Sequence, residues 1–196
     1  MKTSLYRKGK KYREQWRAVF LDSLSLPDDC TAGEIGVYDG DLGPVFYSVA
    51  QAQNYHIIDG SKLNRDDPRL HEHTGEAIEL ASHFKDEYFD FLYIDSCTSY
   101  LDTLQKLGAW WPKVKVGGWL AGHDWSYNNK KRHNGLEVTD AVMDYSTSLL
   151  TARTGKLDTK WIRFQEKKLP EITKGEWRIK KVKGHLWPKV KRENKK

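Results

Sequence analysis

Several short apolar segments of the sequence end in residues that could bind a ligand or accept a proton. These residues are Gly36 with Gly40, then Asp59, then Asp95, then His123 with Asp124. Asp59 follows Gly36 by 23 residues, which is close to the spacing of a carboxylate that hydrogen-bonds the hydroxyls of a ribose. The pattern therefore predicts a site for a cofactor that carries a nucleoside.

The glycine-rich stretch "GEIGVYDGDLG", residues 33–43, limits which cofactor that is. Glycine allows the backbone to turn and to approach a ligand closely. The spacing from Gly36 to Gly40 is GxxxG, and the sequence has neither GxGxxG nor GxxxxGK[ST] there. These absences disfavour a dinucleotide and a nucleoside triphosphate. A plain strand-to-helix turn with a capping aspartate is the structural alternative.

His123 is the candidate general base because an imidazole titrates near neutral pH. Asp95 or Asp124 would orient the ring and favour its protonated form. A competing scheme lowers the pKa of a hydroxyl with a divalent metal such as Mg²⁺, held by Asp95 and Asp124. We favour the histidine base, and the predicted site therefore contains no metal.

The elements that must position these residues alternate between strands and helices. Residues 34–40, which run into a glycine turn, and residues 54–59, 88–95 and 119–125 are predicted to be strands. Residues 10–24, 44–53, 74–84, 98–111 and 138–150 are predicted to be helices. Residues 159–164 and 176–182 are predicted to be two late strands. This order predicts a doubly wound α/β fold with a mostly parallel sheet covered on both faces, and ligands bind such sheets beyond the carboxyl ends of the strands.

With Glu34, Gly36, Gly40, Asp59, "HTGEAIELA" and "FDFLYIDSCTSYLDTLQKLGAWWPKVKVGGWLAGHDW" in this order, the sequence resembles the class I S-adenosylmethionine-dependent methyltransferases. It is most similar to the branch of small sugar and natural-product O-methyltransferases, over about residues 33–145. The resemblance implies a Rossmann-like, seven-stranded sheet whose last strand is antiparallel, and residues 176–182 are well placed for that strand. It also implies S-adenosylmethionine as cofactor and transfer of its methyl group to a hydroxyl.

The resemblance also assigns cofactor-binding residues. The methionine part of the cofactor would lie near Glu34 and Gly36, the ribose on Asp59, and the donor methyl beside Asp95. The complete set of implied cofactor-binding residues is Glu34, Gly36, Tyr38, Gly40, Asp59, Gly60, Gly75, Glu76, Ala77 and Asp95. The catalytic set is His123, Asp95 and Asp124.

The sequence departs from its relatives directly after the strand that ends in Asp95. Where the branch often has "IDADHSY", this chain has "IDSCTSY", so that Cys97 and Thr98 replace an acid and a histidine. A thiol is a poor ligand for Mg²⁺, which weakens the metal scheme. The polar residues 126–135 follow His123 and would form an acceptor-binding loop.

The charge distribution keeps two other function classes open. The net charge is +6, but residues 1–17 carry +6 and residues 180–196 carry +7, which leaves −7 between them. Basic ends suit a nucleic-acid methyltransferase or a non-catalytic module that binds a polyanion. An acidic body instead suits the cationic sulfonium of the cofactor, and we favour a small-molecule or glycan acceptor.

Length and composition predict one domain over residues 1–182, with an amphipathic helix in residues 1–26, a core in residues 33–182 and a basic tail in residues 183–196. The two cysteines, Cys30 and Cys97, form neither a disulfide framework nor a zinc motif. No apolar run could span a bilayer and residues 1–16 do not resemble a secretory signal, so we expect a cytoplasmic enzyme.

Overall fold

The fold is built on one sheet of seven strands in the order β3-β2-β1-β4-β5-β7-β6. The computed structural model describes residues 16–37, 52, 54–62, 68–96, 99–126, 136–168 and 174–184. The strands are β1 (Thr31–Ile35), β2 (Asn54–Asp59), β3 (Leu70–Thr74), β4 (Phe89–Ile94), β5 (Val114–Ser126), β6 (Gly155–Leu157) and β7 (Lys174–Lys181). The first five are parallel, and β7 lies antiparallel between β5 and β6. The predicted doubly wound sheet with an antiparallel last strand is confirmed.

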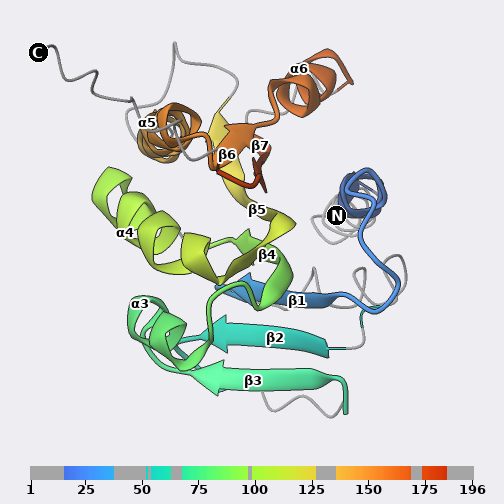
Figure 1. The fold of residues 1–196 in the computed structure, drawn as a ribbon, viewed down its shortest axis with the longest axis vertical. Helices are drawn as coiled ribbons and strands as arrows, with labels where there is room; N and C mark the ends of the chain where they lie inside the picture. Colours follow the sequence, from blue (N-terminus) through green and yellow to red (C-terminus); the bar gives the residue numbers. More distant parts are fainter. Residues whose placement is uncertain are drawn as a thin grey trace, which may run out of the picture.

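Helices cover both faces of this sheet (Figure 1). They are α3 (Ala77–Leu80), η1 (Ala81–His83), α4 (Tyr100–Trp110), η2 (Trp111–Lys113), α5 (Leu136–Ala152) and α6 (Thr159–Lys168), besides a helical segment over residues 16–22. The helices α3, α4 and α5 lie on one side, while α6 and the N-terminal segment lie on the other. None of the helices in the described residues is long and apolar enough to cross a membrane.

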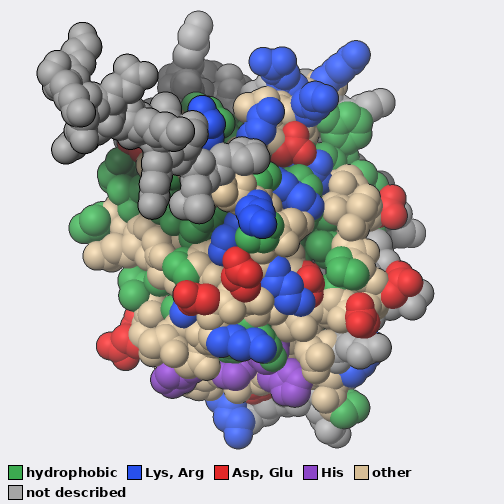
Figure 2. Space-filling view, in the orientation of Figure 1, with side chains coloured by type: hydrophobic (Ala, Val, Ile, Leu, Met, Phe, Trp, Pro, Cys, Tyr) green, Lys and Arg blue, Asp and Glu red, His purple; other side chains and the backbone are tan. Residues whose placement is uncertain are grey.

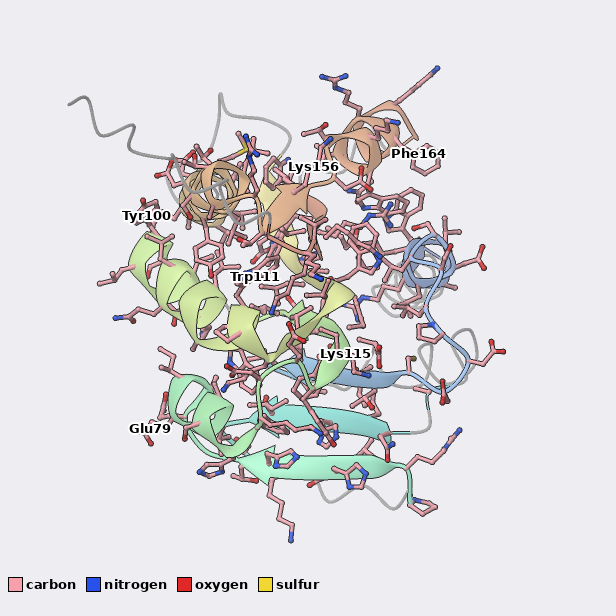
Figure 3. All side chains as sticks on the ribbon, viewed as in Figure 1. Glu79, Tyr100, Trp111, Lys115, Lys156 and Phe164 are labelled. Carbon is pink, nitrogen blue, oxygen red and sulfur yellow. The ribbon has the colours of Figure 1, made fainter. Side chains whose placement is uncertain are left out.

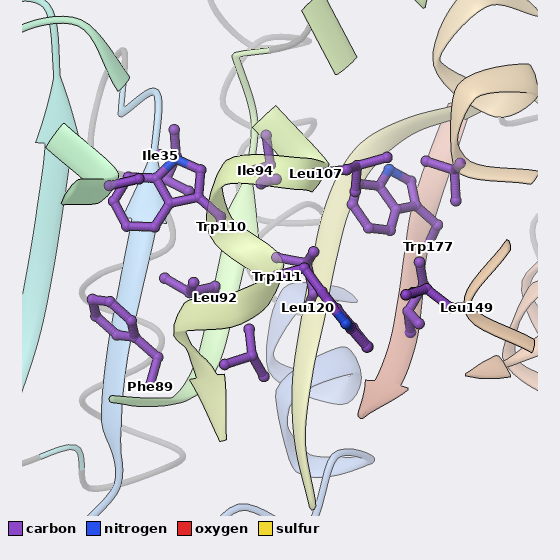
Figure 4. Packing of buried hydrophobic residues seen from close by; sticks show 14 of the residues in the cluster. Ile35, Phe89, Leu92, Ile94, Leu107, Trp110, Trp111, Leu120, Leu149 and Trp177 are labelled. Carbon is purple, nitrogen blue, oxygen red and sulfur yellow. The ribbon is translucent and has the colours of Figure 1, made fainter. Parts of the chain in front are cut away.

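Each face of the sheet has its own hydrophobic core. On the face covered by α3, α4 and α5, Trp110 and Trp177 are fully buried against the aliphatic side chains of β1, β4 and β5 (Figure 4). On the other face, Phe20 of the N-terminal segment packs against Phe91, Tyr93 and the indole of Trp161. Burial of this much aromatic surface on both sides fixes the strands that carry the polar residues.

The segment from residue 159 to residue 164 forms the beginning of α6, so its prediction as a strand was wrong. Trp161 and Ile162 are buried while Arg163 and Phe164 face outward, and such a short run fits either period. Asp158 caps the helix, because its Oδ1 accepts hydrogen bonds from the backbone N–H groups of Lys160 and Trp161 at 3.1 Å each. This capping aspartate was the available signal for a helix.

The helical segment over residues 16–22 has an apolar face, whereas the rest of the predicted N-terminal helix before residue 16 lies outside the described residues. Phe20 and Leu24 are buried, whereas Val19 is 45% exposed. The same face carries Arg17, which is only 5% exposed despite its charge. A buried guanidinium on this helix must have partners, and they lie at the ends of the strands.

Candidate active site

The strand register aligns the predicted site residues in one row across the sheet. Ile35 pairs with both Ile58 and Ile94, and Ile94 pairs with Gly122. The residues that follow these four are Gly36, Asp59, Asp95 and His123. Because the four strands are parallel, all four residues lie at the same carboxyl edge of the sheet, where α/β folds bind their ligands.

Gly36 occupies a position that no other residue fits. Its φ is +83°, in the left-handed region, and a Cβ built on it would lie 2.3 Å from the Cβ of Ser96. The ends of β1 and β4 therefore approach each other more closely than side chains would permit. The glycine allows the chain after β1 to turn at the sheet edge, as a cofactor-binding loop requires.

Asp59 is tied to the loops on both sides of it. Its Oδ2 accepts a hydrogen bond from the N–H of Val37 at 2.8 Å, and its Oδ1 accepts one from the N–H of Ser61 at 2.8 Å. Each carboxylate oxygen has a second lone pair, so the group can still accept hydrogen bonds from ribose hydroxyls. These bonds fix the carboxylate relative to Gly36 before any ligand binds.

The other implied cofactor residues lie in different surroundings. Glu34 is 2% exposed and its Oε2 accepts a hydrogen bond from the Tyr55 hydroxyl at 2.7 Å, so this carboxylate lies beneath the sheet edge. Gly75 has a φ of +149° and leads into α3 through Glu76, with Ala77 as the first helical residue. Gly60 is exposed directly after β2. Tyr38 and Gly40 lie outside the described residues.

His123 lies among carboxylates at the end of β5. Its Nδ1 is 3.0 Å from Oδ1 of Asp124 and 3.7 Å from Oδ1 of Asp95. Asp124 has a left-handed φ of +65°, and the pairing of β5 with β7 shifts register between Gly122 and Trp125. The shift is a bulge, and bulges next to active sites redirect side chains. Here the bulge lets two consecutive residues, His123 and Asp124, meet.

The surroundings of His123 raise the pKa of its imidazole. Burial by itself lowers this pKa, but the hydrogen bond to Asp124 and the charges of Asp95 and Glu176 outweigh the burial. These partners stabilise the imidazolium relative to the neutral ring. A base role for this residue requires the neutral ring, which becomes more populated as the pH rises through the raised pKa.

Arg17 and Glu176, which the sequence patterns did not reveal, complete this cluster. The Nη2 of Arg17 lies 3.2 Å from Oδ2 of Asp95, and the Nε1 of Trp16 donates to Oε2 of Glu176 at 2.9 Å. Burial raises the pKa of Glu176, which is 4% exposed on β7. The nearby carboxylates raise the pKa of Arg17 against the opposing effect of burial.

The missed residues gave only weak signals in the sequence. Arg17 stood among the cations of a basic terminus, and Glu176 alternated with apolar residues as on a solvent-facing strand. Both are covered because α6 and the N-terminal segment lie over this face of the sheet. A third buried group, the hydroxyl of Tyr93, has no hydrogen-bond partner among the described residues. Arg17, Glu176 and Tyr93 therefore lie on the side of the site that α6 and the N-terminal segment cover.

The residues present fit the chemistry of S-adenosylmethionine. Asp59 and Asp95 stand at the sheet edge with Asp124, and anionic groups attract a cationic sulfonium. Among the described residues, no three His, Cys, Asp or Glu side chains converge as metal ligands. Cys97 lies outside the described residues, so its replacement of an acidic residue is known from the sequence alone.

Comparison with known families and structures supports the class that fold and site define. Residues 33–125 match a family described as "Methyltransferase domain". This match confirms that these residues resemble a methyltransferase domain, in agreement with the likeness to the class I, S-adenosylmethionine-dependent methyltransferases. Comparison with curated proteins gave no match.

Solved structures share the fold at low sequence identity. A putative caffeoyl-CoA O-methyltransferase from Staphylococcus aureus has a TM-score of 0.57 and 14% identity, covering 86% of this chain and 83% of that one. An rRNA methylase from Streptococcus thermophilus has a TM-score of 0.59 and 13% identity, covering 85% and 94%. MycE from the mycinamycin biosynthetic pathway, solved with Mg, SAH and mycinamycin VI, has a TM-score of 0.58 and 16% identity, covering 82% and 47%. At these identities the likeness concerns the fold.

Proposed function

We propose that this methyltransferase transfers a methyl group to the hydroxyl oxygen of a small molecule, with a sugar or glycan as the acceptor. The observation that carries the proposal is the row of Gly36, Asp59, Asp95 and His123 at the carboxyl edge of the sheet. The row combines a ribose-binding carboxylate with a histidine base, and an oxygen acceptor needs such a base because its hydroxyl must lose a proton.

In this scheme S-adenosylmethionine supplies a methyl group on a positively charged sulfur. The protein aligns the acceptor oxygen with that methyl group, and alignment of reacting groups accounts for much of the catalysis in such displacements. Asp59 would bind the ribose, and the residues that would hold the rest of the cofactor are Glu34, Gly36, Gly60, Gly75, Glu76 and Ala77. His123 takes the proton of the hydroxyl, and Asp124 holds the Nδ1–H of the ring so that Nε2 is the accepting atom.

The first test is calorimetric titration of the full chain with S-adenosylmethionine and with its demethylated product, with Mg²⁺ present and after chelation. We expect the Asp59→Ala variant to lose at least about tenfold in affinity, because an ionised group that accepts hydrogen bonds is removed. Asp28→Ala, which removes an exposed carboxylate near the other edge of the sheet, is the matched control and should bind as the wild type does. Equal affinity of the two variants would contradict the ribose assignment.

The second test concerns the base. We expect His123→Ala to lower turnover by about 10²–10⁴-fold with almost unchanged cofactor affinity, as removal of a general base does. Turnover is measured by mass spectrometry on an acceptor found in a screen of glycosides and other hydroxyl compounds. His83→Ala removes an exposed imidazole and serves as control. If His123→Ala retained full turnover, the base assignment would be wrong. If the protein methylated RNA and none of the hydroxyl compounds in the screen, the proposal of a small-molecule acceptor would be contradicted.

A further inference from the structure

A cavity lies away from the row of site residues, where β6, β7 and the beginning of α6 meet. Its volume is about 300 Å³, and its apolar wall consists of Trp119, Leu157 and Val182. Trp119 precedes His123 by four residues on β5, which is about 13 Å along the strand toward its opposite end. The cavity is therefore a separate site from the carboxyl edge of the sheet.

Three lysines line this cavity: Lys156 on β6, Lys160 in the first turn of α6, and Lys180 on β7. Lys156 projects from β6 close to α6 (Figure 3). Among the described residues, none of the three is within ion-pair distance of a carboxylate. Further Lys and Arg side chains gather above it over α6 (Figure 2).

The one carboxylate in the lining does not neutralise these lysines. Oδ2 of Asp158 accepts hydrogen bonds from Nε and Nη2 of Arg178 at 3.0 and 2.8 Å, and Oδ1 caps α6. Although burial opposes the change, these hydrogen bonds and the guanidinium lower the pKa of Asp158. Its charge is thereby balanced by Arg178, and the three lysines retain a net positive charge in the cavity.

The surroundings of Lys180 disfavour its positive charge. Its Nζ lies 4.4 Å from the centre of the Trp119 ring, and Arg178 lies over the same ring at 4.9 Å. Burial, and then the charge of Arg178, lower the pKa of Lys180. An anion in the cavity would oppose both effects, because it would bring a counter-charge next to the Lys180 ammonium.

We propose that this cavity binds a small molecule that bears a phosphate group, with the phosphate on Lys156, Lys160 and Lys180 and a compact apolar or aromatic part against Trp119, Leu157 and Val182. A volume of about 300 Å³ lies at the small end of the range of ligand pockets, which fits a single ring with one phosphate. The proposal goes beyond methyl transfer, since none of these residues belongs to the row that ends in His123.

The test uses phenyl phosphate as probe, with benzyl alcohol and inorganic phosphate as comparison ligands, in calorimetric titrations of the full chain at low ionic strength. We expect saturable binding of one phenyl phosphate, weaker binding of inorganic phosphate and none of benzyl alcohol. Lys180→Gln should weaken phenyl phosphate binding by about tenfold, as loss of a charged hydrogen-bond donor does. Lys85→Gln removes a lysine that also lies over an aromatic ring, that of Tyr88, on the far side of the sheet, and should leave binding unchanged.

Substitution of Lys180, which is partly buried, could also destabilise the fold. A double variant of exposed residues, Lys156→Gln with Lys160→Gln, avoids this effect and provides an independent test. Unchanged binding of phenyl phosphate in this variant would overturn the proposal, as would an equal loss in Lys85→Gln. Binding of a ten-nucleotide RNA that both lysine variants weaken, without binding of phenyl phosphate, would also overturn it in favour of a nucleic-acid surface. The affinity for S-adenosylmethionine should be the same in all these variants, so failure here is distinct from failure of the proposed methyl transfer.

Discussion

Two histidines on the same sheet, His123 and His56, have opposite electrostatic surroundings. His123 lies beside Asp124 and Asp95, and its pKa is raised. His56 lies on β2 between the rings of His71 and His73 on the edge strand β3, and burial, followed by these two neighbours, lowers its pKa to about 3. The surroundings thus favour the protonated imidazole at one edge of the sheet and the neutral imidazole on its covered face.

The neutral state of His56 matches its contacts. Its Nδ1 is 3.0 Å from Nε2 of His73, its Nε2 is 3.2 Å from the Tyr88 hydroxyl, and its ring lies edge-on to Phe84 and Phe89. Figure 2 shows the histidine side chains gathered over β2 and β3. This imidazole is a packed core group, whereas His123 has the partners of an acid-base group. Surroundings, and not residue type, therefore distinguish the candidate catalytic histidine.

The largest expected effect comes from removing the cation of the His123 region. Arg17→Met would leave Asp95, Glu34 and Glu176 without the guanidinium that compensates their charges. Breaking a fully buried ion pair costs about 3–5 kcal/mol of unfolding free energy, and because the Asp95 side chain is 28% exposed we expect a loss near the lower end of that range. The loss of a nearby cation should also raise the pKa of His123 further. Urea unfolding and an NMR titration measure the two effects.

Arg163→Met, which removes an exposed cation from α6, is the matched control and should change the unfolding free energy by no more than about 0.5 kcal/mol. A loss below about 1 kcal/mol in Arg17→Met would mean that solvent compensates these carboxylates. The contrast between the two histidine regions would then not depend on the N-terminal segment.

The His56 region should make the fold sensitive to acid. Because the folded-state pKa of His56 lies below the unfolded value of about 6.5, its contribution to stability is present above pH 6.5 and is lost as the pH falls toward about 3. The slope for one such group is at most about 1.4 kcal/mol per pH unit. The contribution of His123 has the opposite sign: it is present below pH 6.5 and is lost as the pH rises through its raised pKa.

Urea unfolding between pH 7 and pH 5 separates the two contributions. In His56→Phe the unfolding free energy should fall less steeply with decreasing pH than in the wild type. Gln105→Phe, which places the same ring at an exposed position on α4 and removes no imidazole, should retain the wild-type slope. Parallel slopes for His56→Phe and the wild type would contradict the assignment of a neutral, packed imidazole.

The sequence was sufficient to predict the row of site residues because each lies at the end of an apolar strand. Parallel strands bring such ends together whatever the details of packing, so Asp59, Asp95 and His123 were placed from local pattern. Arg17 and Glu176 could not be found in this way. Arg17 meets Asp95 across 78 residues of chain, and Trp16 meets Glu176 across 160.

The local errors have the same physical origin. Residues 159–164 were assigned to a strand because Trp161, Ile162 and Phe164 are apolar, and only the tertiary packing of α6 over β7 decides between the two periods. The strand β6 is three residues long and is defined by its pairing with β7 rather than by any pattern of its own. Contacts between distant segments thus determine what the local pattern leaves open.

The smallest expected effect comes from changing the hydrogen bond between Asp124 and His123, a partner that His56 lacks. Asp124→Asn keeps an oxygen that can accept from Nδ1 of His123, and asparagine tolerates the left-handed φ of +65° at this position, so the unfolding free energy should change by no more than about 1 kcal/mol. The pKa of His123 should fall, because a carboxylate that favours the imidazolium is lost. The acidic limb of the pH–turnover profile should move to lower pH with it.

Asp144→Asn, which alters an exposed carboxylate that accepts a hydrogen bond from the Tyr100 hydroxyl, is the control and should shift neither the pKa of His123 nor the pH–turnover profile. If NMR titration found the His123 pKa unchanged in Asp124→Asn, then Asp95 and Glu176 would hold the imidazolium by charge alone, and Asp124 would only orient the ring.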